Sequence, residues 1–231
     1  MNELKYHKRP RTGANFRDII LGGQDGVVNV LGVVLAVSAA TNDTRVILIA
    51  GIAANLAESL SMAAVAYTST KADNQYYKSQ IDAEKREIKE IPMQEKKGIY
   101  LIYYKKGFRG QLLNKIVKKI TSSKKLWIQT MMSDELGLAK PPENPIKATT
   151  IVGIATIIGS TVPLLPFLFF PVKISVILSL IFSTLALFIT GALKSKFTSG
   201  SWVKNGLEMS FIGILTALFS YGVGIFLGKI F

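Results

Sequence analysis

The chain has 231 residues, 49% of them hydrophobic, and carries a formal net charge of +13 at pH 7. It contains no cysteine and a single histidine, His7, so disulfide bonds and zinc sites built from cysteine and histidine are excluded. Its basic residues gather in three segments, 1–18, 71–147 and 194–204, and this pattern favours a membrane-topology signal over nucleic-acid binding.

Five apolar runs are each long enough to cross a hydrocarbon core of about 30 Å as a helix. They are Ile19–Ala40, Val46–Tyr67, Ile146–Phe170, Ile174–Leu193 and Leu207–Leu227. Residues 1–18 are basic and polar, so no cleavable signal peptide is predicted and the first span stays in the mature protein. Placing the three basic segments in the cytoplasm predicts a cytoplasmic N-terminus and an external C-terminus, with anionic lipids as partners.

The first two spans, 19–67, form a predicted hairpin that carries polar residues inside the membrane. A carboxylate such as Asp25 costs about 2.5–3.5 kcal/mol at a bilayer centre, so a functional role is the default. Positions three and four apart share a helix face. One polar stripe therefore lies on each helix, and we expect Asp25 and Met62 at similar depth, with the stripes facing each other or those of a second copy. The stripes are Asp18, Gly22, Asp25 and Asn29, and Asn55, Glu58 and Met62.

Carboxylate and amide oxygens combined with one thioether suit Fe²⁺ and discriminate weakly against Mn²⁺ or Co²⁺. Mg²⁺ and Ca²⁺ gain nothing from sulfur and fit less well. Two structural interpretations stay open, because Asp25 and Glu58 can be a pair that shares a proton and Met62 can simply pack. Gly22, Gly23 and Gly26 permit close helix approach, so the first span can also be a dimer seam.

Residues 68–145 are predicted to form a cytoplasmic insert of three helices built on an extended second helix. No glycine or proline occurs between Ile52 and Ile91, so one helix is expected to run from the membrane to Pro92. Further helices are predicted at 93–106, 111–120 and 124–136, the last with Ser122 or Ser123 as N-cap and Gly137 as a left-handed C-cap. Residues 146–231 contain the remaining spans. Pro163 and Pro166 mark a kink in the third span or, preferably, its end.

The insert repeats the combination of carboxylates and thioethers. Glu84 and Glu87 share a face of the extended helix, and Glu95 follows the break at Pro92. Near the end of the insert, Met131, Met132 and Glu135 lie within about one helical turn. Lysines and arginines interleave with the glutamates, so a solvated charged face is the competing interpretation, and the methionines can equally belong to the core.

Segments in chain order resemble the vacuolar iron transporter family. They are FRDIILGGQDGVV, SMAAVAYTSTKADNQYY, the helix bearing Glu84 and Glu87, MMSDELGL, and NGLEMSFIGILTALFSYGVG. The resemblance covers nearly the whole chain from Arg17 onward, and the pattern MM-x-x-ELGL followed by a proline-bearing link and a span is specific. It implies a five-span homodimer that exchanges Fe²⁺ for protons along a path between protomers lined by the first two spans.

By matching motif, the resemblance makes Asp25 and Met62 transport-site ligands and places Asp18 at the cytoplasmic mouth. It assigns the gathering of ions to the insert, through Glu84, Glu87, Glu95, Met131 and Glu135, with Met132 adjacent. Gly98 departs from the family pattern, in which a glutamate is expected one turn after Glu95, and this leaves ion number and affinity in the insert open. The pathway-lining roles of Glu58, Asn29 and Asn55 rest on helix geometry alone.

We therefore predict proton-coupled antiport of Fe²⁺, with Mn²⁺ or Co²⁺ as further substrates, out of the cytosol at a homodimer interface and without a resident cofactor. Desolvated Asp25 is expected to hold a proton that the metal ion displaces. The alternative is a membrane-anchored metal-binding or storage module without transport. An enzyme is not predicted, because the sequence offers no GxSxG elbow and no nucleophile–base pair with histidine. Plasma and vacuolar membranes are both compatible with the sequence.

Overall fold

The computed structural model describes residues 12–141, 144–195 and 200–230, and the side chains from Phe16 onward. Within these ranges the chain is helical, with short connections and no strand, which confirms the all-α prediction. Five helices are long and apolar enough to cross a membrane, as predicted. They are Phe16–Ala40, Thr44–Glu90, Pro145–Phe169, Val172–Lys194 and Trp202–Leu227.

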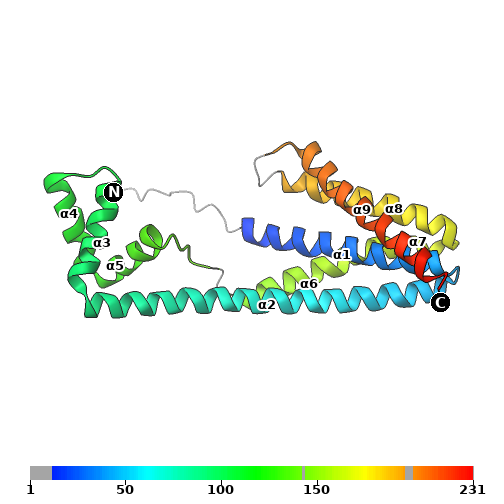
Figure 1. Cartoon of the computed structure of the whole chain (residues 1–231), viewed down its shortest axis with the longest axis horizontal. Coiled ribbons are helices and arrows are strands. Elements are labelled where there is room, and N and C mark those ends of the chain that lie inside the picture. The colour runs from blue at the N-terminus through cyan, green and yellow to red at the C-terminus, as the bar shows by residue number, and fades with distance from the viewer. Residues whose placement is uncertain (1–11, 142–143, 196–199, 231) are drawn as a thin grey trace, which may run out of the picture. The chain divides into compact units, whose positions relative to one another are not determined.

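The chain divides into two compact units, which are described separately. The first comprises residues 1–68 and 144–231, and the second, called the insert below, comprises residues 69–143. Helix α2 (Thr44–Glu90) contributes its first part to one unit and its last part to the other (Figure 1). Most of the basic tail predicted for residues 1–18, and Pro142 and Glu143 of the predicted connector, lie outside the described residues.

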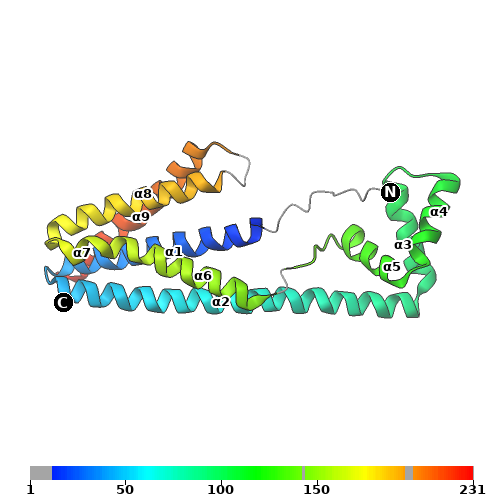
Figure 2. The same cartoon turned by 180° about the vertical axis from the view of Figure 1, so that it is seen from behind.

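Helix α1 (Thr12–Ala40) is the centre of the membrane-spanning unit. It packs against α6 (Pro145–Thr161), α8 (Val172–Lys194) and α9 (Trp202–Leu227), and Figure 2 shows α1 and α6 side by side. Buried aliphatic side chains on several faces of α1 explain why it is apolar almost throughout. They are Val27, Val30, Leu31, Val34 and Leu35.

Glycines set the distance between α1 and α6. A Cβ atom at Gly26 would lie 2.5 Å from both the Thr156 carbonyl oxygen and the Ser160 hydroxyl oxygen, and one at Gly22 would lie 2.7 Å from the Val152 carbonyl oxygen. Only a residue without a side chain permits this contact. The close approach expected for these glycines is thus made to a helix of the same chain.

The α-helix of the third span is interrupted at its prolines. Helix α6 ends at Thr161, and a 3₁₀ turn η2 (Val162–Leu164) leads into the short helix α7 (Leu165–Phe169). Buried serines of α8 donate to carbonyl groups at this break. Ser179 donates to the Pro163 carbonyl at 2.8 Å, and Ser175 donates at 3.0 Å to the Pro166 carbonyl, which also accepts from the Phe170 N–H. Such side-chain donors stabilise a broken helix at membrane depth.

The insert contains the end of α2, α3 (Pro92–Lys105), α4 (Gly110–Thr121), α5 (Lys124–Thr130) and a π-helix η1 (Met131–Glu135). Pro92 begins α3, where its missing N–H costs nothing. Ser123 caps α5 by accepting from the Leu126 N–H, and Gly137 has a φ of +63°. The core of the insert consists of Ile99, Leu113, Val117, Ile120, Trp127 and Met131.

The single helix predicted for residues 124–136 is wrong in its last turn. From Met131 the backbone widens into the π-helix, in which Leu136 N–H donates to the Met131 carbonyl at 3.0 Å. Side-chain periodicity does not distinguish these two helix types over one turn, because both place residues four apart on neighbouring positions. Single π-helical turns are rare and gather at functional sites.

Candidate metal sites

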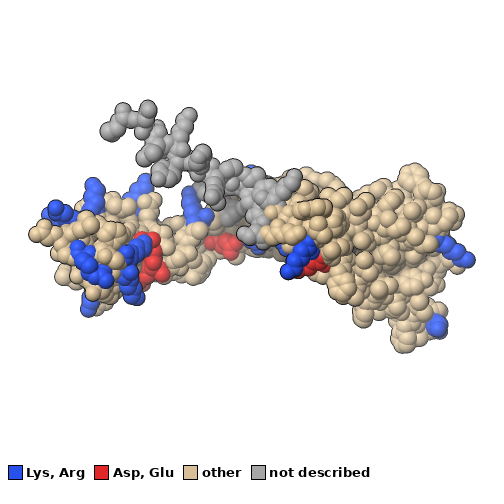
Figure 3. All heavy atoms as spheres, turned by 90° about the horizontal axis from the view of Figure 1, so that it is seen from above, with Lys and Arg blue, Asp and Glu red and all other residues tan. Residues whose placement is uncertain are grey.

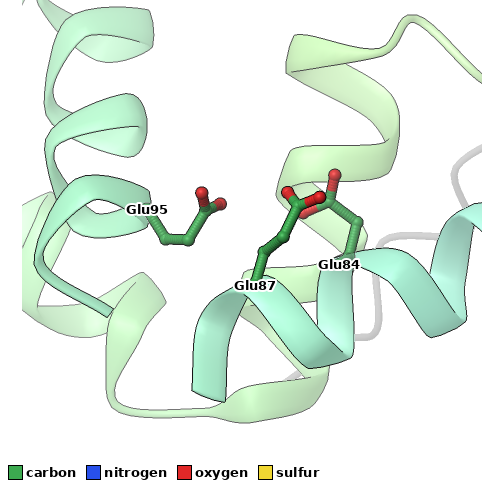
Figure 4. Close-up of side chains that lie close together, drawn as sticks. All are labelled: Glu84, Glu87 and Glu95. Atoms are coloured by element: carbon green, nitrogen blue, oxygen red, sulfur yellow. The ribbon is translucent and has the colours of Figure 1, made fainter. Parts of the chain in front are cut away.

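Three glutamates of the insert converge on one point. Glu84 and Glu87 project from the end of α2 and Glu95 from the first turn of α3, so the break at Pro92 turns the third side chain back toward the first two (Figure 4). One carboxylate oxygen from each lies within 4.8 Å of the others. Oxygen atoms at this spacing can share a single divalent cation.

Two of these carboxyl groups are removed from solvent without a hydrogen-bond partner. Glu84 is 5% exposed and Glu95 is 9% exposed, and one oxygen of each is buried without a partner among the described residues. The ion pairs found in that part of the chain, Lys85–Asp82 and Lys106–Asp134, leave both glutamates out. Because an unpaired buried carboxylate is costly, the arrangement fits a cation-binding role better than a solvated charged face.

The raised pKa values of the clustered carboxyl groups also support a cation-binding role. Burial, followed by the neighbouring carboxylates of Glu95, Glu87 and Glu135, raises the pKa of Glu84 to about 7. Burial also raises the pKa of Glu95, with further contributions from Glu87 and Glu135. Near neutrality Glu84 is therefore protonated in a large share of the metal-free molecules, and a divalent cation that binds its carboxyl group must displace that proton.

Met131 and Glu135 approach the same region from the π-helix. A Cβ atom at Gly98, one turn after Glu95 in α3, would lie 3.7 Å from the Glu135 Oε2 atom and 3.7 Å from the Met131 Cε atom. A carboxylate and a thioether thus meet opposite the face of α3 that carries Glu95. Met131 also belongs to the core of the insert, and Met132 is 2% exposed, so both methionines are buried.

An ion pair holds the π-helix against α3. Lys106 Nζ lies 2.6 Å from the Asp134 carboxylate and 4.9 Å from the centre of the Tyr103 ring. Asp134 immediately precedes Glu135, so this pair helps to orient the carboxyl group that faces Gly98. The sequence analysis missed this role, although the acidic residue within MMSDE was visible.

A second group of polar side chains lies in the membrane-spanning unit. The Glu58 side chain of α2 lies beside the Asp25 carboxyl group of α1 and the Asn29 amide. Asp25 and Glu58 are half-buried and Asn29 is exposed in the single chain. Two carboxyl groups side by side repel each other when both are charged. The polar stripes predicted for the first two spans therefore meet at these three residues.

The other predicted residues of these spans lie apart from that contact. Met62 is half-buried one turn beyond Glu58, and Asp18 is half-buried about two turns before Asp25. Asn55 is buried toward α6, where its amide donates to the Thr161 hydroxyl at 3.4 Å and accepts from the Ser59 hydroxyl at 3.2 Å. This polar contact between α2 and α6 was not foreseen, because residues 106 positions apart in the sequence carry no signal of their pairing.

The model of the VIT family matches residues 16–225, which is most of the chain. The chain belongs to the VIT family. The chain is 30% identical to vacuolar iron transporter 1 of Eucalyptus grandis over 224 residues, covering 95% of this chain and 90% of the relative.

Relatives in the VIT family extend beyond that one plant. Vacuolar iron transporter 1 of Arabidopsis thaliana is 29% identical over 218 residues, covering 93% of this chain and 87% of the relative. A vacuolar iron transporter of Toxoplasma gondii is 26% identical over 232 residues, covering 94% of this chain and 77% of the relative. The resemblance drawn from the sequence motifs is confirmed by these matches.

Proposed function

We propose that this member of the VIT family transports Fe²⁺ out of the cytosol in exchange for protons. Its relatives are named vacuolar iron transporters and match over most of their length. The observation that carries the proposal is the contact between the Asp25 and Glu58 carboxyl groups inside a membrane-spanning unit. A membrane anchor has no use for two carboxyl groups that must be desolvated.

The insert gathers metal ions before transport. Its four carboxyl groups, from Glu84, Glu87, Glu95 and Glu135, offer hard oxygen ligands, and the Met131 thioether favours Fe²⁺ over Mg²⁺ or Ca²⁺. Ions held there raise the local concentration available to the spans. Mn²⁺ and Co²⁺, which accept the same ligands, are further candidate substrates.

Proton exchange follows from the chemistry of the membrane pair. Keeping both Asp25 and Glu58 charged at this spacing is unfavourable, so a proton can occupy the pair when no cation does. A cation that reaches Asp25 displaces this proton, because a protonated carboxyl group is a poor metal ligand. Metal ion and proton therefore compete for the same oxygen atoms. Because metal binding on one side of the membrane releases a proton, the movement of one ion is coupled to the opposite movement of the other. Met62 supplies sulfur one turn away, at the cytoplasmic side of Glu58.

We further propose that two copies of the chain form the path. Asn29 is exposed in the single chain beside Asp25, and an amide facing lipid is unfavourable. A second copy placed over this face would cover Asn29 and bring two Asp25 carboxyl groups toward one axis. In this arrangement the basic segments and the insert face the cytoplasm, and the C-terminus faces the opposite side.

A membrane-anchored storage module remains the second candidate, and the insert favours it. The three converging glutamates come from one contiguous segment and need no residue from the spans. Storage predicts stoichiometric metal binding by the full chain with no metal flux across a sealed membrane. It offers no use for the Asp25–Glu58 contact, which is why transport is preferred.

The test is metal flux in proteoliposomes with a pH-sensitive dye and a metal-sensitive dye inside. An inward Fe²⁺ gradient should drive metal entry together with alkalinisation of the lumen, and an imposed proton gradient should accelerate entry. Parallel runs with Mn²⁺, Co²⁺, Zn²⁺ and Mg²⁺ establish selectivity. Metal entry without a pH change would reject exchange, and binding without entry would select the storage module.

A further inference from the structure

The insert also contains a groove that is not part of the acidic cluster. A groove of about 570 Å³ lies between α2 and α5. Its first wall consists of Tyr77, Ile81 and Lys85, which are four residues apart and share one face of α2. Glu84, three residues after Ile81, borders this face, and its carboxyl group lies with those of Glu87 and Glu95. The second wall is formed by Lys124, Lys125, Ile128 and Gln129 of α5, with Lys140 from the segment after the π-helix.

The lining of the groove combines positive charge with apolar surface. Four lysines contribute to it, of which Lys85 is paired with Asp82 at 2.8 Å. Neither ion pair found among the described residues includes Lys124 or Lys125, although both are exposed and adjacent. The half-buried side chains of Tyr77, Ile81 and Ile128 lie beside these lysines. A ligand that matches this lining carries an anionic group and an apolar part.

The charge of the whole insert favours an anionic partner. Residues 69–143 contain 16 lysines and arginines against 9 aspartates and glutamates, a difference of +7. On the face shown in Figure 3 the basic side chains gather on the insert, whereas the surface of the membrane-spanning unit is largely uncharged. A basic segment attached to a membrane span experiences a high local concentration of anionic lipid headgroups.

We propose that the groove between α2 and α5 binds the headgroup of an anionic phospholipid. The phosphate lies against Lys124 and Lys125, and the glycerol and first acyl carbons contact Ile81 and Ile128. A soluble phosphate would leave the apolar wall unused, which is why a lipid is the better match. The groove shares no lining residue with the acidic cluster or with the membrane pair.

A single fluorophore in the groove reports binding. The chain has no native cysteine, so Gln129→Cys gives one labelling position on the groove wall. The labelled full chain in neutral detergent is titrated at low salt with dihexanoylphosphatidylglycerol, dihexanoylphosphatidylcholine and glycerol phosphate. We expect a saturable emission change with phosphatidylglycerol alone, weakened by added salt. The unlabelled chain is compared by native mass spectrometry, which counts bound phosphatidylglycerol.

Two matched double variants distinguish binding in the groove from attraction by the net positive charge of the insert. Lys124→Gln with Lys125→Gln should raise the half-saturation concentration about 25-fold, from about fivefold for each lysine. Lys118→Gln with Lys119→Gln removes the same charge from exposed residues of α4 outside the groove and should change it less than about twofold. Intact Trp127 emission, measured in a Trp202→Phe background, establishes that each variant is folded.

Three results would overturn the proposal. Equal losses in the two double variants would mean that net charge, and not the groove, attracts the lipid. Equal affinity for glycerol phosphate would assign the groove to a soluble phosphate compound. An equal response to phosphatidylcholine would remove charge recognition altogether.

Discussion

The acidic cluster of the insert is complete within one copy of the chain, whereas the Asp25–Glu58 pair of the membrane-spanning unit is open on one side. In the insert, Glu84, Glu87 and Glu95 come from helices that follow each other directly, and their oxygens converge within 4.8 Å. In the membrane-spanning unit, Asp25 and Glu58 face each other across two spans with Asn29 exposed beside them. The first group is a compact cluster, whereas the second is a pair with one open side.

The difference indicates a division of labour. A cluster of several carboxyl groups and a thioether binds a cation well and can concentrate it. Two carboxyl groups that open onto an uncovered face bind a cation less tightly, which suits an ion that must leave again. Substitutions in the two groups should therefore affect different kinetic quantities.

The largest expected effect is on transport through the membrane pair. Asp25→Asn keeps the shape of the side chain but cannot exchange a proton for a cation, so Fe²⁺ flux should fall about 100-fold or more. Metal binding by the insert should remain. The control is Asp43→Asn in the loop before α2, where an amide oxygen can still accept from the Arg45 N–H, as Asp43 does at 2.8 Å. Wild-type flux in Asp25→Asn under a proton gradient would exclude this pair as the transport site.

In the insert, replacing a carboxylate by an amide should lower the affinity for metal ions. Glu84→Gln removes the most buried carboxylate of the cluster, and metal affinity should fall about 10–100-fold. The KM for Fe²⁺ should rise while the maximal flux changes little, because saturating metal bypasses the gathering step. Glu90→Gln, on the exposed end of the same helix, is the matched control. A large loss of maximal flux in Glu84→Gln would mean that the insert belongs to the conduction path.

In the membrane-spanning unit, the contact between α1 and α6 should be sensitive to added side-chain volume. Gly26→Ala forces a methyl group against α6 and should destabilise the unit by about 1–3 kcal/mol. Gly222→Ala in α9 has nothing within 4 Å of the added atom and should be tolerated. Thermal unfolding in detergent, read by circular dichroism, compares the two variants. Equal melting temperatures would show that the α1–α6 contact is not tight.

The pH dependence of stability should differ with and without metal. Because the pKa of Glu84 is raised from 4.5 to about 7, the folded insert holds this proton more tightly than the unfolded chain does. Stability of the metal-free insert is therefore highest below pH 4.5 and falls as pH rises through about 7. Urea unfolding followed by Trp127 emission, in a Trp202→Phe background, measures this. The slope should weaken in Glu84→Gln and reverse with saturating metal.

The smallest effects are expected at Gly98. Gly98→Ala fits at ordinary contact distances and removes a flexible residue from α3, so it should stabilise the insert by about 0.5–1 kcal/mol. Gly98→Glu places another carboxylate beside Glu135 and Met131. It should tighten metal binding about tenfold, at some cost to metal-free stability. Isothermal titration of both variants tests this, and equal affinities would show that position 98 does not face the bound ion.

Much of this molecule was predictable from sequence. Apolar runs of about 20 residues gave the five spans, since a bilayer core imposes that length. The absence of glycine and proline between Ile52 and Ile91 predicted the long α2, and Pro92 its end. The positive φ of Gly137 and the Ser123 cap also agree with the sequence, because they depend on local backbone chemistry.

Other features depended on contacts between distant residues. The sequence placed Asp25 and Glu58 on suitable faces, but which of Asn29, Asn55 and Met62 would join them was not determined. Asn55 points to Thr161 instead, and the packing of α6 on α2 decides this. Gly22 and Gly26 were open to use in a dimer seam, and the fold uses them against α6.

By itself the sequence determined the number of spans, the helical class and the residue types available for metal chemistry, because hydrophobic length and side-chain chemistry are local properties. Only the tertiary structure decided that Glu84, Glu87 and Glu95 converge, that the π-helix brings Met131 and Glu135 to Gly98, and that Asp25 meets Glu58. Those contacts depend on where each helix turns and which face it buries, and packing fixes both.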